Sequence, residues 1–240
     1  MNASSRDKVM CVQEYKNNSE EGRSYVAVIG DIKGSRKLSD RAACQLKLKK
    51  VLNGINEMYA EAIASKLTIT IGDEFQGLFA DGAPVLDVLT QIAFEMQPVE
   101  FRFGIGIGPI FTDINPQVSV GADGPAYHRA RSAVDAVKNT EGRNRSAPSS
   151  LLVFSDSPAD LYVNASLKLL HALADAWSNR QKEIIYDILI HRDSQVNVAA
   201  RHGITQPTVQ KILSSGRYYS FQDSYDAIVH YLSEVKSIDI

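Results

Sequence analysis

The order of strand-like and helix-like patterns in residues 25–107 limits the fold of this chain more than any other feature. Residues 25–31 form an apolar run that predicts a buried strand ending in a carboxylate, and residues 40–63 carry apolar side chains at helical spacing. Two β-rich runs then follow, residues 67–71 and 75–79, on either side of Gly72-Asp73-Glu74. Such a turn between two β-rich runs predicts a hairpin with acidic residues at its tip.

A second helix and a fourth strand complete this pattern. Asp81 is the predicted N-cap of the helix, and Pro98 lies just beyond its end. Residues 101–107 predict a strand whose glycines allow another group to approach closely. The resulting order is βαββαβ, which is that of a ferredoxin-like domain with an antiparallel sheet.

The rest of the chain is predicted to be mainly helical. A helix is expected over residues 125–138, a short strand over 151–154, a helix starting at Ser157-Pro158, and helices alone from there to the end. We therefore predict an α/β (α+β) protein with four parts. They are a polar tail (1–24), a ferredoxin-like α/β domain (25–155), a connecting helix (156–178) and an all-α domain (179–240).

Three carboxylates are placed where they can do chemistry. Asp31 ends the first strand, and Asp73 and Glu74 occupy the hairpin turn of the next two. In a βαββ arrangement these strand ends can be neighbours, so the carboxylates are expected to converge and to need a cation between them. Clusters of oxygen ligands suit Mg²⁺ or Mn²⁺, which in turn bind nucleotide phosphates. The alternative is that Asp31 caps a turn and the other two fill a turn that favours acidic residues.

Three motifs resemble the GGDEF nucleotide cyclases. Ile71-Gly72-Asp73-Glu74-Phe75 looks like their signature hairpin, Asp31-Ile32 like their first metal-binding aspartate, and the helix ending at Lys138 with Gly142-Arg143-Asn144-Arg145 like their closing helix and loop. The resemblance implies a nucleotide-cyclase-like domain in which Asp31, Asp73 and Glu74 bind metal and, if the domain is active, act in catalysis. The chain departs from the cyclase pattern at Ile71 and Lys33, so turnover is left open.

More narrowly, the chain is similar to the SatD family, in which a cyclase-like domain precedes a helix-turn-helix. The similarity lies in residues 29–36, Gly72-Asp73-Glu74-Phe75-Gln76-Gly77-Leu78 and Gly124-Pro125-Ala126-Tyr127-His128.

Basic residues near these motifs are the candidate phosphate ligands. Lys33 and Arg36 lie close to the end of the first strand, where they can meet a triphosphate beside the metal. The cyclase resemblance implies Lys138 and Arg145 as phosphate contacts, with Arg131 competing with Lys138, and Gly72 at the nucleotide.

The second strong pattern is a helix-turn-helix in residues 179–214. Of its three helices, the second is predicted to bury Val198 and Ala199. Gly203 makes the turn, Ile204 plugs it, and Val209 with Ile212 anchors the third helix. The alternative is a three-helix scaffold for protein contacts.

The polar residues of that third helix, with Arg217 just after it, are the candidate DNA ligands. Gln206, Thr208 and Gln210 are expected to read base edges, and Lys211 and Arg217 to hold phosphates. Double-stranded DNA is therefore the expected partner, and the few basic residues favour a homodimer as the functional form.

Composition and charge limit what the protein can bind and where it can act. The formal net charge is −2, so any binding to nucleic acid must be local. The chain has two cysteines without metal-ligand spacing, and no run of about 18 apolar residues. We expect a cytoplasmic protein without a membrane partner.

These patterns favour a DNA-binding regulator whose α/β domain binds a nucleoside triphosphate or other nucleotide and a divalent metal. One alternative is an active nucleotidyl cyclase or nucleotidyltransferase that uses the helix-turn-helix for localisation or dimerisation. The other is a protein-interaction module with both sites degenerate.

Overall fold

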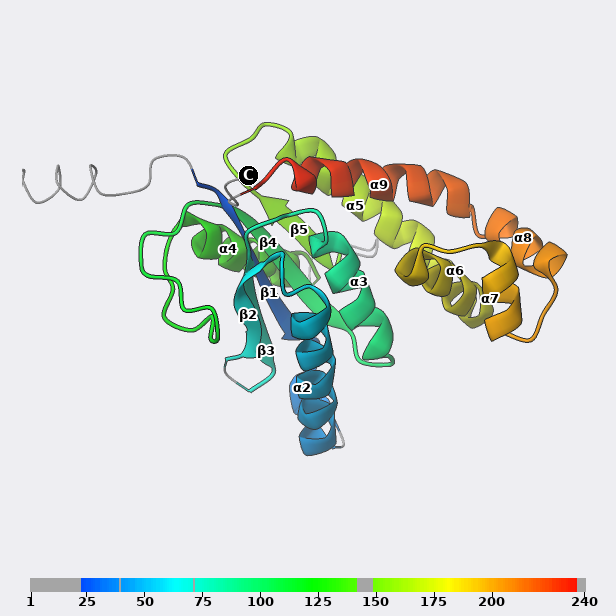
Figure 1. Cartoon of the computed structure of the whole chain (residues 1–240), viewed down its shortest axis with the longest axis horizontal. Helices are drawn as coiled ribbons and strands as arrows, with labels where there is room; N and C mark the ends of the chain where they lie inside the picture. Colours follow the sequence, from blue (N-terminus) through cyan, green and yellow to red (C-terminus); the bar gives the residue numbers. More distant parts are fainter. Residues whose placement is uncertain (1–22, 39, 71, 142–148, 237–240) are drawn as a thin grey trace, which may run out of the picture.

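The computed structural model describes residues 23–38, 40–70, 72–141 and 149–236. A sheet with helices on both faces forms one part of the molecule, and a group of helices lies beside it (Figure 1). The predicted tail (1–24) falls almost wholly outside the described residues.

Within the described residues the sheet has five strands in the order β2-β3-β1-β4-β5. Neighbours among the first four are antiparallel, as predicted, whereas β5 is parallel to β4. The parallel pairing follows from the connection, because a long helix carries the chain back along the sheet between β4 and β5. The strands are β1 (Tyr25–Ile32), β2 (Ile63–Ile69), β3 (Glu74–Phe79), β4 (Phe101–Gly108) and β5 (Leu151–Phe154).

Helices cover both faces of this sheet. Alternate residues of β1 point to opposite faces, so Val26 and Val28 join the core beneath α2 (Arg41–Met58) and α3 (Val85–Glu95). Ala27 and Ile29 pack on the other face against α4 (Pro125–Glu141).

Several predicted element ends differ from the structure, and β2 (Ile63–Ile69) begins four residues before the strand predicted over 67–71. The helix over 40–63 ends at Met58, because Ala62 N–H bonds to Tyr59 O in a turn and β2 then starts at Ile63. Asp81 accepts a hydrogen bond from Ala83 N–H and so caps a turn; the N-cap of α3 is Pro84. The helix expected at Ser157-Pro158 starts after one further turn.

The C-terminal part is helical, as predicted. Its helices are α5 (Asp160–Asp175), α6 (Asn179–His191), α7 (Gln195–Arg201), α8 (Gln206–Ser215) and α9 (Tyr218–Ser233). None of the helices in the described ranges is long and apolar enough to cross a membrane.

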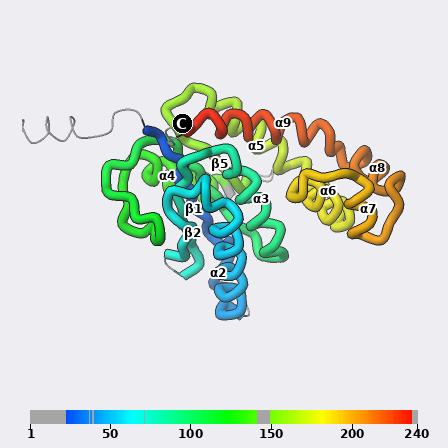
Figure 2. Tube along the Cα trace, in the orientation of Figure 1, coloured from blue at the N-terminus to red at the C-terminus, as the bar shows by residue number. Residues whose placement is uncertain are grey.

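Helix α9 ties the helical part to the sheet part. It runs back from α8 past α5 to the end of the sheet (Figure 2), where Gly82 N–H bonds to Val235 O at 3.0 Å. Tyr225, Ile228 and Leu232 are buried along it, so its apolar stripe is a core element. A single hydrophobic cluster includes these residues and those beneath α3. Helices α7 and α8 lie at the end farthest from the sheet (Figure 1).

Candidate functional site

Three charged residues form a row across the end of the sheet. In the strand register, Asp31 of β1 lies opposite Glu74 of β3 on one side and opposite Arg102 of β4 on the other. Asp31 is two residues beyond Ile29 and therefore lies on the same face, which is covered by α4. The sheet thus places two carboxylates and a guanidinium side by side beneath α4.

Helix α4 adds two cations above this row. Arg131 donates two hydrogen bonds to Glu74, from Nη1 to Oε2 at 2.5 Å and from Nη2 to Oε1 at 2.6 Å. Lys138 Nζ lies 3.3 Å from Asp31 Oδ1, and Arg102 Nη1 donates to Asp31 Oδ2 at 2.9 Å. Arg131 and Lys138 are seven residues apart, two helical turns, so one helix face brings both to the carboxylates. Arg131 and Lys138, which the sequence left as alternative phosphate ligands, therefore both contact the carboxylates.

The carboxylates of these pairs are more buried than their cations. The side chains of Asp31 and Glu74 are 12% and 15% exposed, whereas those of Lys138 and Arg131 are 38% and 42% exposed. The hydrogen bonds to Glu74 raise the pKa of the Arg131 guanidinium above its ordinary value. The carboxylates thus form the floor of the site, and the two cations of α4 lie nearer to solvent.

The predicted group of three carboxylates is formed only in part. Asp31 and Glu74 are brought together, but across the described residues no group of three or more histidines, cysteines or acids is arranged to hold a metal ion. Asp73 lies in the hairpin turn, where its carbonyl accepts a hydrogen bond from Ile32 N–H at 3.2 Å. The reason for the difference is that β3 begins at Glu74, so Glu74 and not Asp73 is the register partner of Asp31.

The other predicted nucleotide ligands that the structure describes are Gly72, Lys33 and Arg36. Gly72 has a left-handed φ of 67°, and Gln45 of α2 donates a hydrogen bond to its carbonyl. Lys33 forms an ion pair with Glu100 at 3.4 Å, and Arg36 is exposed on the short 3₁₀ helix η1 (Ser35–Lys37). Arg145 lies outside the described residues.

Arg102 was not predicted as a site residue, because only the glycines of this strand were interpreted. The sequence does contain a pattern that places it at the site. Arg102 is the single charged residue in the run 101–107 and shares the two-residue period of Gly104 and Gly106, so it had to lie on their face of the sheet.

The second candidate site is the helix-turn-helix of α7 and α8. Val198, Ala199 and Val209 are buried as predicted, and Leu213 joins them. Gly203 makes the turn with a φ of 62°, and Thr205 caps α8 by accepting a hydrogen bond from Thr208 N–H.

The predicted DNA ligands lie on the outer side of this unit. Gln206, Thr208, Lys211 and Arg217 are exposed. Gln210 is half-buried and accepts hydrogen bonds from Gln195 at 2.7 Å and from Tyr219 at 2.8 Å.

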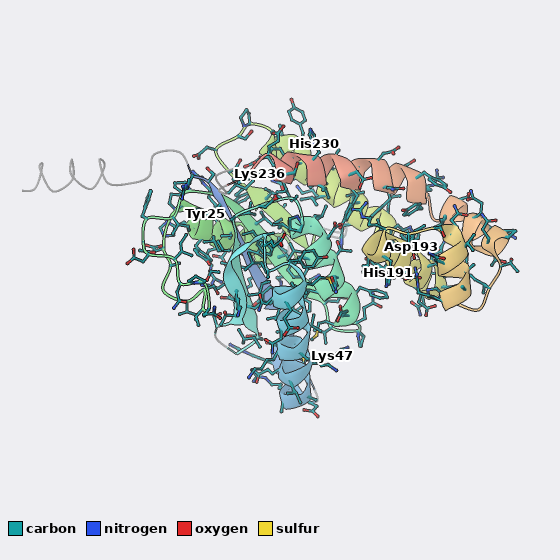
Figure 3. All side chains as sticks on the ribbon, in the orientation of Figure 1. Tyr25, Lys47, His191, Asp193, His230 and Lys236 are labelled. Atoms are coloured by element: carbon teal, nitrogen blue, oxygen red, sulfur yellow. The ribbon has the colours of Figure 1, made fainter. Side chains whose placement is uncertain are left out.

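Asp187 explains two polar residues of the turn region. This buried carboxylate of α6 accepts hydrogen bonds from Arg201 at 3.1 Å, and it lies 2.9 Å from His202 Nε2. Asp193, labelled beside His191 in Figure 3, pairs with Arg201 as well. His202, which stands where such units usually have an apolar residue, is thus held by an acid. Arg201 is held by two acids and contributes little positive field to the surface of the helix-turn-helix.

The sequence has no match among curated proteins. One similar structure is the catalytic core of a rhodopsin-guanylyl cyclase with converted specificity in complex with ATPαS, at 20% identity and a TM-score of 0.32, covering 47% of this chain and 72% of that one. Another is a regulator of polyketide synthase expression from Bifidobacterium adolescentis, at 14% identity and a TM-score of 0.29, covering 94% of this chain and 91% of that one.

The sequence also matches a family model. The model of the SatD family matches residues 25–220, from the first strand of the sheet into α9. The match therefore includes both the charged row beneath α4 and the helix-turn-helix. The chain belongs to the SatD family.

Proposed function

We propose that this protein is a cytoplasmic DNA-binding regulator whose α/β part binds a nucleotide together with a divalent metal. The observation that carries the proposal is the unit of α7 and α8, in which a buried apolar anchor and a glycine turn leave Gln206, Thr208 and Lys211 exposed on α8. A helix held in this way by its neighbour can enter the major groove.

The basic residues left for phosphate contact are few. Lys211 and Arg217 are exposed, whereas the guanidinium of Arg201 is engaged by Asp187 and Asp193. Each phosphate contact contributes about one unit to the slope of log affinity against log salt, so one copy of the chain should bind weakly. A homodimer on two half-sites is therefore the form we propose.

Fluorescence anisotropy tests the DNA half of the proposal. The full chain is titrated against a random duplex pool and against duplexes selected from it, at two salt concentrations. Lys211→Ala and Arg217→Ala should weaken binding to all sequences and lower the salt slope by about one unit, whereas Gln206→Ala should change sequence preference. Lys49→Ala, an exposed lysine on α2, is the matched control. Absence of binding to every duplex at low salt contradicts the proposal.

The nucleotide half rests on the charged row. Asp31 and Glu74 supply hard oxygen ligands of the kind that Mg²⁺ and Mn²⁺ prefer. Mg²⁺ is usually bound by one or two carboxylates together with substrate phosphates, so these two carboxylates fit such an ion, and Asp73 lies in the adjoining turn. A bound cation would offset the charge of nucleotide phosphates at this edge. Arg131 and Lys138 are the proposed phosphate ligands, with Lys33, Arg36, Gly72 and Arg145 as further candidates from the sequence.

Titration calorimetry with a nucleoside triphosphate and Mg²⁺ tests this half. Asp31→Asn removes a charge at constant volume and should abolish metal-dependent binding while the far-ultraviolet circular dichroism stays unchanged. Arg145→Ala should weaken triphosphate binding more than nucleoside binding, because an arginine fork matches phosphate geometry. Equal losses for both ligands would make Arg145 structural.

The same row of side chains favours a second candidate function, an active nucleotidyl cyclase or nucleotidyltransferase. Two carboxylates beneath cations could hold a metal and stabilise the charge that develops on a transferred phosphoryl group. Incubation with each of the four nucleoside triphosphates and Mg²⁺ or Mn²⁺, followed by product analysis, separates the two. A new phosphodiester product would identify an enzyme, and unchanged triphosphate would favour the regulator.

A further inference from the structure

The oxygens of the two paired carboxylates all have basic partners. Lys138 lies at Asp31 Oδ1 and Arg102 at Asp31 Oδ2, while the two arms of Arg131 bind Oε1 and Oε2 of Glu74. Thr70 Oγ1 adds a contact to Glu74 Oε1 at 3.3 Å. A divalent cation that approached Asp31 or Glu74 in this arrangement would meet a positive charge at each oxygen.

The three cations differ in how easily they can leave. Arg102 is the most enclosed, with a side chain that is 18% exposed, and it belongs to the sheet itself. Arg131 and Lys138 reach down from α4 on long side chains and are 42% and 38% exposed. Rotation of these two side chains would remove the cation from one oxygen of Asp31 and from both oxygens of Glu74 without any change in the backbone.

Releasing the carboxylates alone is unfavourable. An arginine fork on a half-buried carboxylate forms charge-assisted hydrogen bonds, and breaking them without a replacement leaves charges unpaired. A metal ion alone would give the carboxylates a new positive partner but would leave Arg131 and Lys138 without a negative one. A triphosphate alone would give these two cations a new negative partner but would leave the carboxylates without a positive one.

From this balance we infer that the metal and the triphosphate bind to this site only together, by exchange of counter-ions. In the free protein Arg131 and Lys138 neutralise Glu74 and Asp31. When a metal–triphosphate complex binds, the metal takes over the carboxylates and the phosphates take over Arg131 and Lys138. Arg102 stays on Asp31 in both states and keeps it in place. This inference rests on the proposed nucleotide site.

Manganese binding measured by electron paramagnetic resonance tests the exchange, because the six-line signal of free Mn²⁺ disappears on binding; the loss that the nucleotide analogue causes without protein is measured separately and subtracted. The wild-type protein should bind Mn²⁺ alone weakly. It should bind Mn²⁺ at least about tenfold more tightly in the presence of an ATP or GTP analogue. The analogue carries a methylene group between the α- and β-phosphates, so this bond cannot be cleaved. Tenfold corresponds to about 1.4 kcal/mol.

Two variants should break the coupling in opposite ways. Arg131→Gln leaves Glu74 without its fork, so Mn²⁺ alone should bind about tenfold more tightly while the metal–triphosphate complex binds more weakly. Glu74→Gln frees Arg131, so the metal-free triphosphate should bind more tightly than to wild type, while Mn²⁺ no longer enhances its binding. Arg180→Gln, which removes an exposed arginine paired with Glu183 on α6, is the control and should change none of these values.

The outcomes separate the inference from the function on which it rests. Wild-type protein that binds Mn²⁺ alone as tightly as with nucleotide, or an Arg131→Gln variant whose affinity for Mn²⁺ alone is unchanged, overturns the exchange but leaves the nucleotide site standing. Wild-type protein that binds neither metal nor triphosphate under any condition contradicts the exchange and the proposed nucleotide site together. If Arg131→Gln fails to fold, the Glu74→Gln arm decides.

Discussion

A single methyl group on β4 should disturb both the stability and the charged row, since α4 lies directly on the glycines of that strand. A Cβ built on Gly106 would lie 2.0 Å from the carbonyl oxygen of Ala126 and 2.3 Å from the amide nitrogen of Ala130. Real Cβ atoms essentially never approach other atoms closer than 3.0 Å, so α4 would have to move by about 1 Å or β4 would have to bend. Both atoms belong to the backbone, so no side chain can rotate to make room.

Overpacking a core typically costs 1–3 kcal/mol, and a clash with helix backbone belongs at the upper end of that range. We therefore expect Gly106→Ala to lower the free energy of unfolding by about 3 kcal/mol, which for a chain of this size is a drop of about 6–12 °C in Tm. Gly54→Ala is the matched control. Gly54 lies inside α2 with no atom within 4 Å of a built Cβ, so alanine there should raise stability by up to about 1 kcal/mol. Thermal and urea denaturation measure both changes, and a Gly106→Ala protein as stable as wild type would refute the reasoning.

Three further changes test other contacts. Burial lowers the pKa of His171, so the unfolded chain takes up a proton more readily than the folded one. The free energy of unfolding should therefore fall as the pH drops below about 6.5. His171→Gln should reduce this dependence when stability is measured between pH 7 and pH 5. Tyr225→Phe removes a hydrogen bond of 2.8 Å to Asp87 and should cost about 1 kcal/mol in urea denaturation. Asp187→Asn leaves Arg201 with a weaker partner and should lower the free energy of unfolding by about 2 kcal/mol in urea denaturation, with faster amide exchange in α7.

Local patterns predicted most of the elements, because the helices bury one apolar face each and β1, which is covered on both faces, is an unbroken apolar run. The exceptions lie where the same apolar residues fit two patterns. Tyr59, Ala62 and Ile63 continue the helical spacing of α2, yet Ile63 pairs with Phe79 and starts β2. The outcome depends on a strand partner sixteen residues away, which a local pattern does not contain. The direction of β5 likewise depends on its neighbour in the sheet and not on its own sequence.

The candidate site was predictable to a similar depth. That Asp31 and the hairpin acids meet follows from the order of strands, but which acid lies opposite Asp31 follows from the register, and the register selects Glu74. The sequence left Lys138 and Arg131 as alternatives, whereas the helix presents both on one face. Of the helix-turn-helix anchors, Val198, Ala199 and Val209 are buried as predicted, because they are close together in the sequence and share one local geometry. Ile212 is half-buried, and its neighbour Leu213 is the buried residue of that turn.

The glycines of β4 connect packing to the chemistry of the site. Arg102, Gly104 and Gly106 alternate along the strand and lie beneath α4; the two glycines have no side chain to hold the helix away, and the first position carries a guanidinium. The close approach at Gly104 and Gly106 sets the height of the whole helix above the sheet. That height brings the cations further along α4, Arg131 and Lys138, onto the carboxylates. A glycine stripe that looks purely structural in the sequence therefore determines how far the cations lie from the acids. For this reason, a substitution at Gly106 should weaken metal-dependent nucleotide binding even though Gly106 makes no contact with any charged side chain of the site.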